Sequence, residues 1–283
     1  MTSSSTKIYG LIGYPVKHSL SPLMHNAAFS SLKIDAEYRL FEVKPQELKD
    51  FIGSLVQRNI CGLNVTIPHK ESVAPLLDSV SPEARLIGAV NTIKVADRKL
   101  EGFNTDGEGF LEHIKGELHF DPEGKKISMI GAGGAARAVS VILSKSKAKR
   151  LNIFDVDKPK ASALVNHLKD NFKNVEFKAV VSIDELDAGE SDLLVNATPI
   201  GMKDSDPCLI EDRSLHKDIL VYDLIYNPKE TKLLKAAKSK GAKVSNGLGM
   251  LLYQGAIAFQ IWTGKAAPIE IMRAALEEGV RSL

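Results

Sequence analysis

The sequence has only two cysteines, Cys61 and Cys208, among its 283 residues. They lie far apart and have no His or Cys at metal-ligand spacing, so we expect neither a disulfide scaffold nor a bound metal. The formal net charge is only +2. The chain therefore lacks the large charge of one sign that is typical of proteins that bind nucleic acid or an anionic membrane surface. Apolar runs also stay below the roughly 18 residues that a membrane-spanning helix needs.

The chain begins with a short polar stretch, residues 2–6 (TSSST), which leads at once into a strand-like run. This beginning lacks the apolar core of a signal peptide, so we expect a cytoplasmic protein. With 44% hydrophobic and 25% charged residues, the composition is typical of globular proteins. The length leaves room for two domains, each with its own core.

The segment 126–138 (KISMIGAGGAARA) predicts a buried strand, a glycine turn and a helix. It fits the pattern Gly-x-Gly-x-x-Ala. Gly131 permits a tight turn, Gly133 lets backbone N–H groups approach a pyrophosphate, and Ala136 keeps the helix close to the sheet. The start of the helix would offer free N–H groups and the positive end of its dipole to phosphates. A plain strand–helix turn is the alternative on this pattern alone.

The residues after this turn continue to alternate between strand and helix patterns. We expect strands at 126–131, 150–155, 175–180, 192–196, 219–223 and 242–244, and helices at 134–144, 158–170 and 229–240. This alternation predicts a doubly wound dinucleotide-binding domain. The segment 196–202 follows a strand end and should therefore face the cofactor. Asp157 is suited to cap the helix that begins at Lys158.

The first half of the chain predicts a second α/β unit. We expect strands at 8–13, 36–43 and 61–67, helices at 45–56 and 71–77, and a hairpin from 89–95 and 100–104. Helices at 247–263 and 268–281 would close the chain. The predicted fold is thus α/β with two domains: an N-terminal substrate domain with a mixed, mostly parallel sheet, residues 1–105 completed by 248–283, and a Rossmann domain, residues 106–247.

Several polar residues stand where parallel sheets hold ligands. Ser19 and Ser21 precede a helix in which Pro22 suits the first position; Ser21 is either the helix cap or, with Ser19, part of an anion site. Lys70 opens the expected helix 71–77, where a cation is misplaced for the helix dipole, although a solvated lysine is the simpler interpretation. Asn91 lies in a strand-like segment that disfavours asparagine, and Asp106 is suited to a helix cap or to a site. We interpret His18, His25 and His69 as loop residues, because no partner is visible for any of them.

With these residues assembled, the chain resembles the shikimate dehydrogenase family, which includes quinate/shikimate dehydrogenases. The likeness is carried by eight motifs in the family's order: 13–22 (GYPVKHSLSP), 64–70 (NVTIPHK), 88–92 (GAVNT), 102–107 (GFNTDG), the glycine turn, 196–199 (NATP), 223–226 (DLIY) and 249–256 (GMLLYQGA). The resemblance implies reversible hydride transfer between a nicotinamide cofactor and shikimate or 3-dehydroshikimate, in the synthesis of aromatic amino acids.

The resemblance also implies roles for individual residues. Lys70 and Asp106 would be the catalytic pair, and Ser19 and Ser21 would hold the substrate carboxylate, with Tyr226 nearby. The remaining implied substrate ligands are Asn64, Thr66, Asn91 and Gln254, and the implied cofactor ligands are Gly131, Ala132, Gly133, Gly134, Ala135, Asp155, Thr198, Met202 and Gly247. We expect Lys70 to act as acid in reduction and as base in oxidation, with Asp106 orienting it.

The sequence departs from the family pattern at the end of the second Rossmann strand. Members that use NADP(H) usually carry an Asn-Arg-Thr-like run there, whose arginine meets the 2′-phosphate, whereas this chain has Asp155, Val156 and Asp157. A carboxylate suits free ribose hydroxyls and repels a phosphate dianion, although Lys158 and Lys160 lie close in the sequence. We therefore expect NAD as the favoured cofactor, with NADP as the alternative.

Shikimate is the expected substrate, because the Ser19 and Ser21 pair resembles that of shikimate-specific members. An NAD-dependent enzyme acting on both quinate and shikimate is the alternative, since one added hydroxyl is often weakly discriminated. A folate-type methylene dehydrogenase is disfavoured, because a pterin needs no such anion site. A non-catalytic sensor of cofactor and polyol acid is a further alternative. We expect small-molecule partners only, and a monomer or a homodimer.

Overall fold

A computed structural model describes residues 6–210 and 214–282. The chain divides into two compact units. Unit 1 holds the described residues up to Gly109 and again from Leu251, and unit 2 runs from Phe110 to Met250. Both boundaries fall inside helices, α4 (Asp106–Gly116) and α8 (Leu248–Thr263). The boundaries expected from the sequence lie four and three residues earlier, so Asp106, which they assign to the Rossmann domain, lies in unit 1.

Unit 1 contains a six-stranded sheet in the order β2-β1-β3-β5-β6-β4. Its strands are β1 (Lys7–Gly13), β2 (Ala36–Glu42), β3 (Ile60–Val65), β4 (Ser79–Val80), β5 (Thr92–Ala96) and β6 (Lys99–Phe103). β1 is parallel to β2 and β3, whereas β5 is antiparallel to β3 and β6. The β5–β6 hairpin turns at Asp97 and Arg98, which both have positive φ, as a tight hairpin turn requires. The sheet is mixed, which confirms the prediction.

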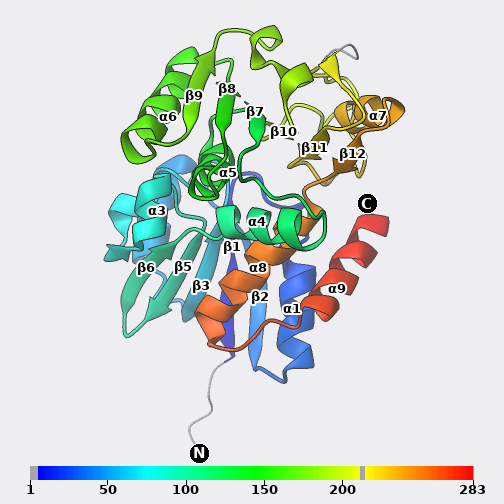
Figure 1. Cartoon of the computed structure of the whole chain (residues 1–283). Coiled ribbons are helices and arrows are strands. Elements are labelled where there is room, and N and C mark those ends of the chain that lie inside the picture. Colours follow the sequence, from blue (N-terminus) through cyan, green and yellow to red (C-terminus); the bar gives the residue numbers. More distant parts are fainter. Residues whose placement is uncertain (1–5, 211–213, 283) are drawn as a thin grey trace, which may run out of the picture. The chain divides into compact units, whose positions relative to one another are not determined.

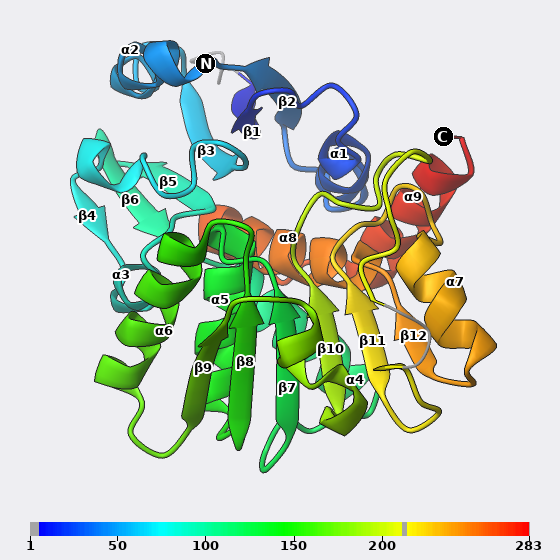
Figure 2. The same cartoon turned by 90° about the horizontal axis from the view of Figure 1, so that it is seen from above.

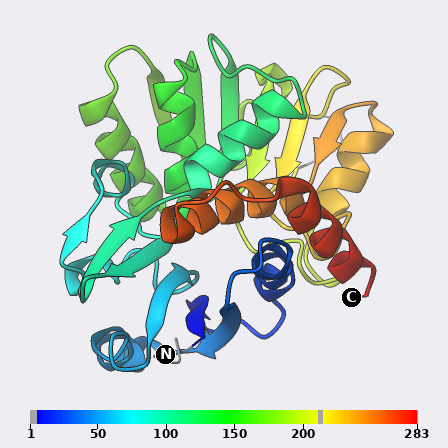
Figure 3. The same ribbon diagram turned by 90° about the horizontal axis from the view of Figure 1, so that it is seen from below.

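The helices of unit 1 are α1 (Ser21–Ser31), η1 (Pro45–Glu47), α2 (Leu48–Gly53), η2 (Ala74–Leu76), α3 (Pro82–Ile87), the C-terminal part of α8, and α9 (Ile269–Arg281). Helices α1 and α9, far apart in the sequence, lie side by side (Figures 1 and 3). A buried apolar cluster under the sheet includes Ile12, Leu63, Val65 and Ile93. Burying these side chains is the main force that holds the unit together.

Unit 2 contains a second six-stranded sheet, in the order β12-β11-β10-β7-β8-β9, and every adjacent pair is parallel (Figure 2). Its strands are β7 (Lys126–Ile130), β8 (Arg150–Phe154), β9 (Glu176–Val180), β10 (Leu193–Asn196), β11 (Leu220–Asp223) and β12 (Lys243–Ser245). Counted from β7, the spatial order is 3-2-1-4-5-6, that of the Rossmann fold. The strand order reverses between β7 and β10, where such folds bind dinucleotides.

The helices of unit 2 are the rest of α4, then α5 (Gly134–Lys145), α6 (Lys158–Asn171), η3 (Asp184–Leu186), η4 (Ala188–Glu190) and α7 (Lys232–Ser239). Asp157 caps α6 as predicted, because its side chain accepts a hydrogen bond from the backbone N–H of Lys160. Helix α5 buries Ala136, Ala138 and Val139 against the sheet. In the described part of the chain, none of the helices is both long and apolar enough to span a membrane.

Two local predictions in unit 1 are wrong. The helix expected at 71–77 is a loop that contains only the short η2, since Pro75 in the middle of that segment lacks the N–H that an α-helix needs. Lys70 therefore does not open a helix, and the argument from a misplaced helix dipole fails. The sequence analysis also missed α3 and β4, where Ser81 caps α3 and Gly88, with φ 74°, ends it.

Candidate active site

Lys70 and Asp106 form a close ion pair in unit 1. The Nζ atom of Lys70 lies 2.6 Å from Oδ2 of Asp106, and the two side chains are only 15% and 6% exposed. Lys70 follows β3 on a loop that is held by a hydrogen bond from Val90 N to Lys70 O. Asp106 is the first residue of α4, and a helix start favours a carboxylate there. A buried pair of this kind keeps a donor group and a carboxylate in fixed geometry.

Asn91 connects this pair to its surroundings. Its Nδ2 atom donates to Oδ1 of Asp106 at 2.8 Å, and its Oδ1 atom accepts the backbone N–H of Thr105 at 2.8 Å. Asn91 is only 2% exposed. Its position just before β5 explains why a strand-like segment carries an asparagine: the amide is needed to bind the carboxylate. Asp106 thus accepts one hydrogen bond on each carboxylate oxygen, from Asn91 and from Lys70.

Gln254 reaches the same group of residues from α8. Its Oε1 atom lies 3.4 Å from Nδ2 of Asn91, and its Nε2 atom donates to Leu251 O at 2.8 Å. The backbone of Gln254 packs so closely on α4 that a Cβ atom at Gly109 would lie 2.4 Å from Gln254 N. Helix α8 therefore enters unit 1 and brings the amide of Gln254 beside Asn91.

Ser19 and Ser21 lie together at the start of α1. Ser19 Oγ donates to Ser21 Oγ at 3.1 Å, and Ser21 N donates to Ser19 Oγ at 3.2 Å. Ser21 is already the first residue of the helix, while Leu20 occupies the cap position without a side-chain cap bond. The interpretation of Ser21 as the helix cap is wrong. Two hydroxyl groups next to an uncapped helix start suit a small anion.

The resemblance implies three further substrate ligands, Asn64, Thr66 and Tyr226. Asn64, at the end of β3, is buried and bonds to the carbonyl oxygen of Asn91 through Nδ2 at 3.3 Å. Thr66 follows directly, with its N–H bonded to Ile12 O at 2.9 Å and its methyl group against Gly13. Tyr226 belongs to unit 2, where it follows β11. Unit 1 by itself thus brings together Lys70 and Asp106 with Asn64, Asn91 and Gln254.

Some residues of this polar group were not predicted from the sequence. Tyr38, Thr92 and Thr105 are buried and hydrogen-bonded to the predicted residues. The prediction that His25 is a loop residue is wrong: it lies inside α1, is fully buried and stacks on Tyr38 with ring centroids 4.4 Å apart. Burial lowers the pKa of His25 to about 3, so its ring is neutral. Nothing local in the sequence distinguishes these side chains from ordinary core residues.

The glycine turn in unit 2 has the geometry that a pyrophosphate requires. Gly131 has φ 110°, and a Cβ atom there would lie 2.9 Å from Ala197 O, so only glycine fits. Gly133 takes the cap position of α5 without a side-chain cap, and a Cβ atom at Gly133 would meet open space. The N–H groups of the first helical turn, at Gly134 and Ala135, thus remain directed at an open region that suits phosphate.

The residues after β10 lie on the other side of the point where the strand order reverses, opposite the glycine turn. Asn196 Oδ1 accepts both the N–H and the hydroxyl of Thr198, at 3.0 and 2.8 Å. Its Nδ2 atom donates to the buried Asp223, whose pKa is raised by burial. Met202, also predicted to contact the cofactor, is 56% exposed. Gly247 packs on the next loop, where a Cβ atom would lie 2.0 Å from Leu224 O.

Asp155 stands at the end of β8, beside the glycine turn. Its Oδ2 atom accepts the N–H of Ala132 at 2.7 Å, and its Oδ1 atom accepts the N–H of Asp157 at 2.9 Å. Both oxygens are therefore fixed, and each keeps a free lone pair for a hydroxyl donor. Val156, which follows, is 89% exposed. The residues at this position thus fit the ribose of a dinucleotide.

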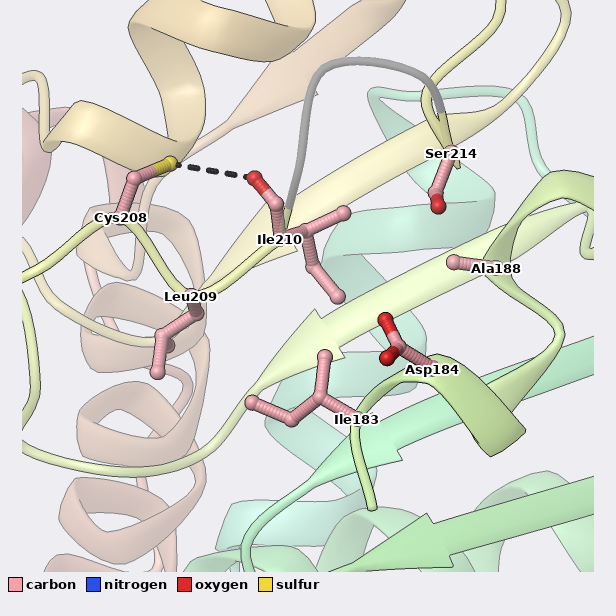
Figure 4. A pocket seen from close by; sticks show the side chains of 7 residues that line it. All are labelled: Ile183, Asp184, Ala188, Cys208, Leu209, Ile210 and Ser214. Atoms are coloured by element: carbon pink, nitrogen blue, oxygen red, sulfur yellow. Dashed lines mark hydrogen bonds between the residues drawn. The ribbon is translucent and has the colours of Figure 1, made fainter.

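Unit 2 also contains a cavity of about 500 Å³ between the segment 183–188 and the residues 208–210 and 214 (Figure 4). Its lining is Ile183, Asp184, Ala188, Cys208, Leu209, Ile210 and Ser214. The thiol of Cys208 is turned to Ile210 O at 3.4 Å. None of these residues belongs to the glycine turn or to the Lys70–Asp106 pair. The cavity is therefore not the predicted cofactor site.

The fold and the sites define a class of protein: a nicotinamide-dependent dehydrogenase with a Rossmann unit and a separate unit that carries a Lys–Asp pair. Comparison with known proteins makes this specific. Residues 11–93 match the family model described as the shikimate dehydrogenase substrate binding domain, and residues 247–277 match the shikimate 5′-dehydrogenase C-terminal domain. The chain belongs to the shikimate dehydrogenase family.

Similar proteins match over nearly the whole chain. A shikimate dehydrogenase (NADP(+)) of Methanopyrus kandleri is 46% identical, covering 98% of this chain and 97% of the relative. A crystal structure of a shikimate dehydrogenase in complex with NADP+ has a TM-score of 0.91 at 43% identity, covering 99% and 98%. The enzyme of Listeria monocytogenes, in complex with shikimate and NAD, has a TM-score of 0.88 at 37% identity, covering 97% of each chain. The name of the Methanopyrus kandleri enzyme specifies NADP+, so it does not support the predicted preference for NAD.

Proposed function

We propose that this protein is a shikimate dehydrogenase, which oxidises a ring hydroxyl of shikimate reversibly with a nicotinamide dinucleotide as hydride acceptor. The observation that carries the proposal is the Lys70–Asp106 ion pair, bordered by the amides of Asn91 and Gln254. A polyol substrate needs such a group of donors and acceptors, because each buried ring hydroxyl must be hydrogen-bonded. The Listeria relative, crystallised with shikimate and NAD, supports the same function.

In this proposal Lys70 handles the proton. The cofactor, when bound, supplies or accepts the hydride at the substrate carbon. In the reduction, Nζ of Lys70 donates a proton to the carbonyl oxygen, and in the oxidation it takes the proton from the hydroxyl group. Asp106 holds Nζ by its Oδ2 atom, and Asn91 holds Asp106 by its Oδ1 atom. Ser19 and Ser21 bind the carboxylate with their hydroxyl groups and the helix start of α1.

The residues of unit 2 fit the dinucleotide. The first turn of α5 would hold the pyrophosphate, with Gly131 and Gly133 giving the space, and Thr198 would line the switch point. Asp155 would accept hydrogen bonds from the ribose hydroxyls of the adenosine half. Since an anionic carboxylate at this place repels a 2′-phosphate, and Val156 offers no cation to bind it, we propose that the enzyme prefers NAD(H) to NADP(H).

The substrate proposal is shikimate rather than quinate. Quinate carries an extra hydroxyl on the carbon that bears the carboxylate, next to the two serine hydroxyls. The hydroxyl oxygens of Ser19 and Ser21 lie 3.1 Å apart, so both hydroxyl groups can turn their hydrogens toward one carboxylate. The similar proteins reported above are named for shikimate, which does not favour dual specificity. A sensor without catalysis would have no need of the Lys70–Asp106 pair.

One assay tests these proposals. The purified protein is given shikimate or quinate with NAD+ or NADP+, and formation of the reduced nicotinamide is followed by its absorbance. We expect turnover with shikimate, a higher kcat/KM with NAD+ than with NADP+, and little activity on quinate. Absence of shikimate-dependent reduction with either cofactor would refute the proposed function. A preference for NADP+ would refute only the argument from Asp155.

A further inference from the structure

Tyr38 is hydrogen-bonded to the polar group of the candidate active site from a different strand. It lies in β2, is only 2% exposed, and donates its phenolic hydrogen to Oδ1 of Asn64 at 2.8 Å. Burial raises the pKa of Tyr38 well above its usual value, so the phenol keeps its proton. The side chain of Ser21 lies near the same phenol and opposes this rise in its pKa. The ring is held in place by stacking on the neutral His25.

The direction of these hydrogen bonds is determined by groups that cannot reverse. The backbone carbonyl of Asn91 only accepts, so the Asn64 atom 3.3 Å from it must be Nδ2. The other amide atom of Asn64, which faces Tyr38, is therefore the oxygen. Tyr38 must therefore donate its single proton to this oxygen.

The same reasoning extends from Asn64 toward the catalytic pair. Nδ2 of Asn64 also donates to Oγ1 of Thr92 at 3.1 Å, and Thr92 donates to Oδ1 of Asn91 at 2.9 Å. The backbone N–H of Thr105 points at the same Oδ1 atom, which settles the orientation of the Asn91 amide. Nδ2 of Asn91 is then left to donate to Asp106, a carboxylate that accepts only. Every proton in this series points from Tyr38 toward Asp106.

We propose that Tyr38 and Thr92 are positioning residues, which hold the oxygen atoms of the Asn64 and Asn91 amides in place within one ordered chain, Tyr38–Asn64–Thr92–Asn91–Asp106. The proposal rests on the proposed function for the identity of the substrate. Both amide hydrogens of Asn64 are used inside the protein. Asn64 therefore offers a ligand only the remaining lone pair of its oxygen, and it selects a ring hydroxyl that donates.

Loss of the Tyr38 hydroxyl weakens this selection. In Tyr38→Phe the oxygen of Asn64 loses its buried donor. Nδ2 of Asn64 stays on the Asn91 carbonyl, but the oxygen is no longer held and can tilt away from the substrate hydroxyl that it accepts. Because a hydrogen bond of this kind corresponds to about 1.4 kcal/mol, we expect kcat/KM for shikimate to fall about 10-fold. Thr92→Val interrupts the chain on the other side of Asn64 and should have a similar effect.

The chain offers matched controls for both variants. Tyr9 is the register partner of Tyr38 on the adjacent strand β1 and is 3% exposed, but it lies outside the ordered chain. Tyr9→Phe should leave kcat/KM within about twofold of the wild-type value. Its melting temperature should change by about as much as that of Tyr38→Phe. Thr92→Ser keeps the hydroxyl and should restore most of the activity lost in Thr92→Val. The double variant Tyr38→Phe/Thr92→Val should lose less than the product of the single effects, because both act through Asn64.

Two measurements separate this proposal from the proposed function. The first is the NMR spectrum of the side-chain amides, which needs no substrate: the Asn64 and Asn91 signals should shift in Tyr38→Phe and Thr92→Val but not in Tyr9→Phe. The second is binding, by calorimetry, of shikimate and of analogues that each lack one ring hydroxyl. The loss caused by Tyr38→Phe should disappear for the one analogue that lacks the hydroxyl held by Asn64, whereas a merely structural role would weaken all analogues equally.

Each outcome decides something. Unchanged amide signals in Tyr38→Phe would overturn the ordered chain. If the amide signals shifted in Tyr38→Phe but its kcat/KM were the same as that of Tyr9→Phe, the positioning role would be overturned. An equal loss of affinity for every analogue would overturn it as well. If the wild-type protein failed to turn over shikimate while the amide signals still responded to Tyr38→Phe, the proposed function would be wrong and the positioning of the two amides would stand.

Discussion

The ammonium nitrogen of Lys70 lies 2.6 Å from Oδ2 of Asp106, and neither side chain is more than 15% exposed. The two residues are brought together from a loop after β3 and from the first turn of α4. Their separation is that of a charge-assisted hydrogen bond, which fixes direction as well as distance. An amine held in this way can deliver and recover a proton at one place on a substrate.

Replacing the carboxylate tests the part of Asp106 in this pair. Asp106→Asn keeps the shape of the side chain but removes the negative charge that holds Nζ of Lys70. We expect kcat with shikimate to fall by about 100-fold, in the range usual for acid–base groups, with a smaller change in KM. Asp78→Asn is the control, because Asp78 is a carboxylate of unit 1 whose bond is to the exposed Leu100 N–H. Equal rates for the two variants would remove Asp106 from the mechanism.

The nucleotide preference depends on the residues that follow β8. In Val156→Arg, a cation would stand at an exposed position beside the ribose site. We expect kcat/KM for NADP+ to rise about 10-fold or more, because a hydrogen bond to a charged phosphate contributes about 1.5–3 kcal/mol. In Asp155→Ala the preference for NAD+ over NADP+ should become smaller. The ribose hydroxyls of NAD+ lose a hydrogen-bond acceptor, and the 2′-phosphate of NADP+ is no longer repelled by a carboxylate. An unchanged ratio of the two cofactors in both variants would contradict the assignment of Asp155.

Acid should destabilise the protein through His25. Burial holds the pKa of His25 at about 3, below its unfolded value of 6.5. Between these values the unfolded chain binds a proton that the folded chain does not, so stability is full above pH 6.5 and is lost as the pH falls toward 3. The loss from this group is on the order of 4 kcal/mol. Unfolding by urea between pH 4 and 7 should show a shallower pH dependence in His25→Leu; parallel curves would exclude His25.

The approach of α8 to α4 can be tested at Gly109. In Gly109→Ala the new Cβ atom would lie 2.4 Å from Gln254 N, so the backbone that carries Gln254 must move. We expect a loss of about 1–3 kcal/mol in stability and weaker binding of shikimate. Gly116→Ala, in the same helix, is the control, because a Cβ atom at Gly116 meets nothing within 4 Å. It should be neutral or slightly stabilising; similar losses in both variants would argue against the contact with Gln254.

Much of the fold could be predicted because its signals are local. The glycine turn, the alternation of strands and helices after Lys126 and the cap at Asp157 each depend on a few consecutive residues. The prediction of a helix at 71–77 was wrong because Pro75 lacks the backbone N–H that the interior of an α-helix needs. The sequence of helix α1 does not indicate that His25 is buried, because the five buried residues of this helix include polar ones, Ser21 and His25, beside apolar ones.

The site could be predicted only in its composition. Family resemblance and strand ends indicated Lys70, Asp106, Asn64 and Asn91, and the structure brings these together. The residues that orient them, such as Tyr38 and Thr92, come from other strands, and a buried Tyr or Thr in a strand is ordinary. Their role depends on which atom donates to which, a property of three-dimensional contacts that no spacing along the chain reveals.

The central claim is tested most directly by the steady-state kinetics of Lys70→Met, which keeps the length of the side chain and removes its proton. With shikimate and saturating NAD+, we predict that kcat falls by at least about 100-fold while KM for shikimate changes only a few-fold. Circular dichroism of the variant should match that of the wild type. A kcat close to that of the wild-type protein would contradict the account, because the chemistry would then proceed without Lys70.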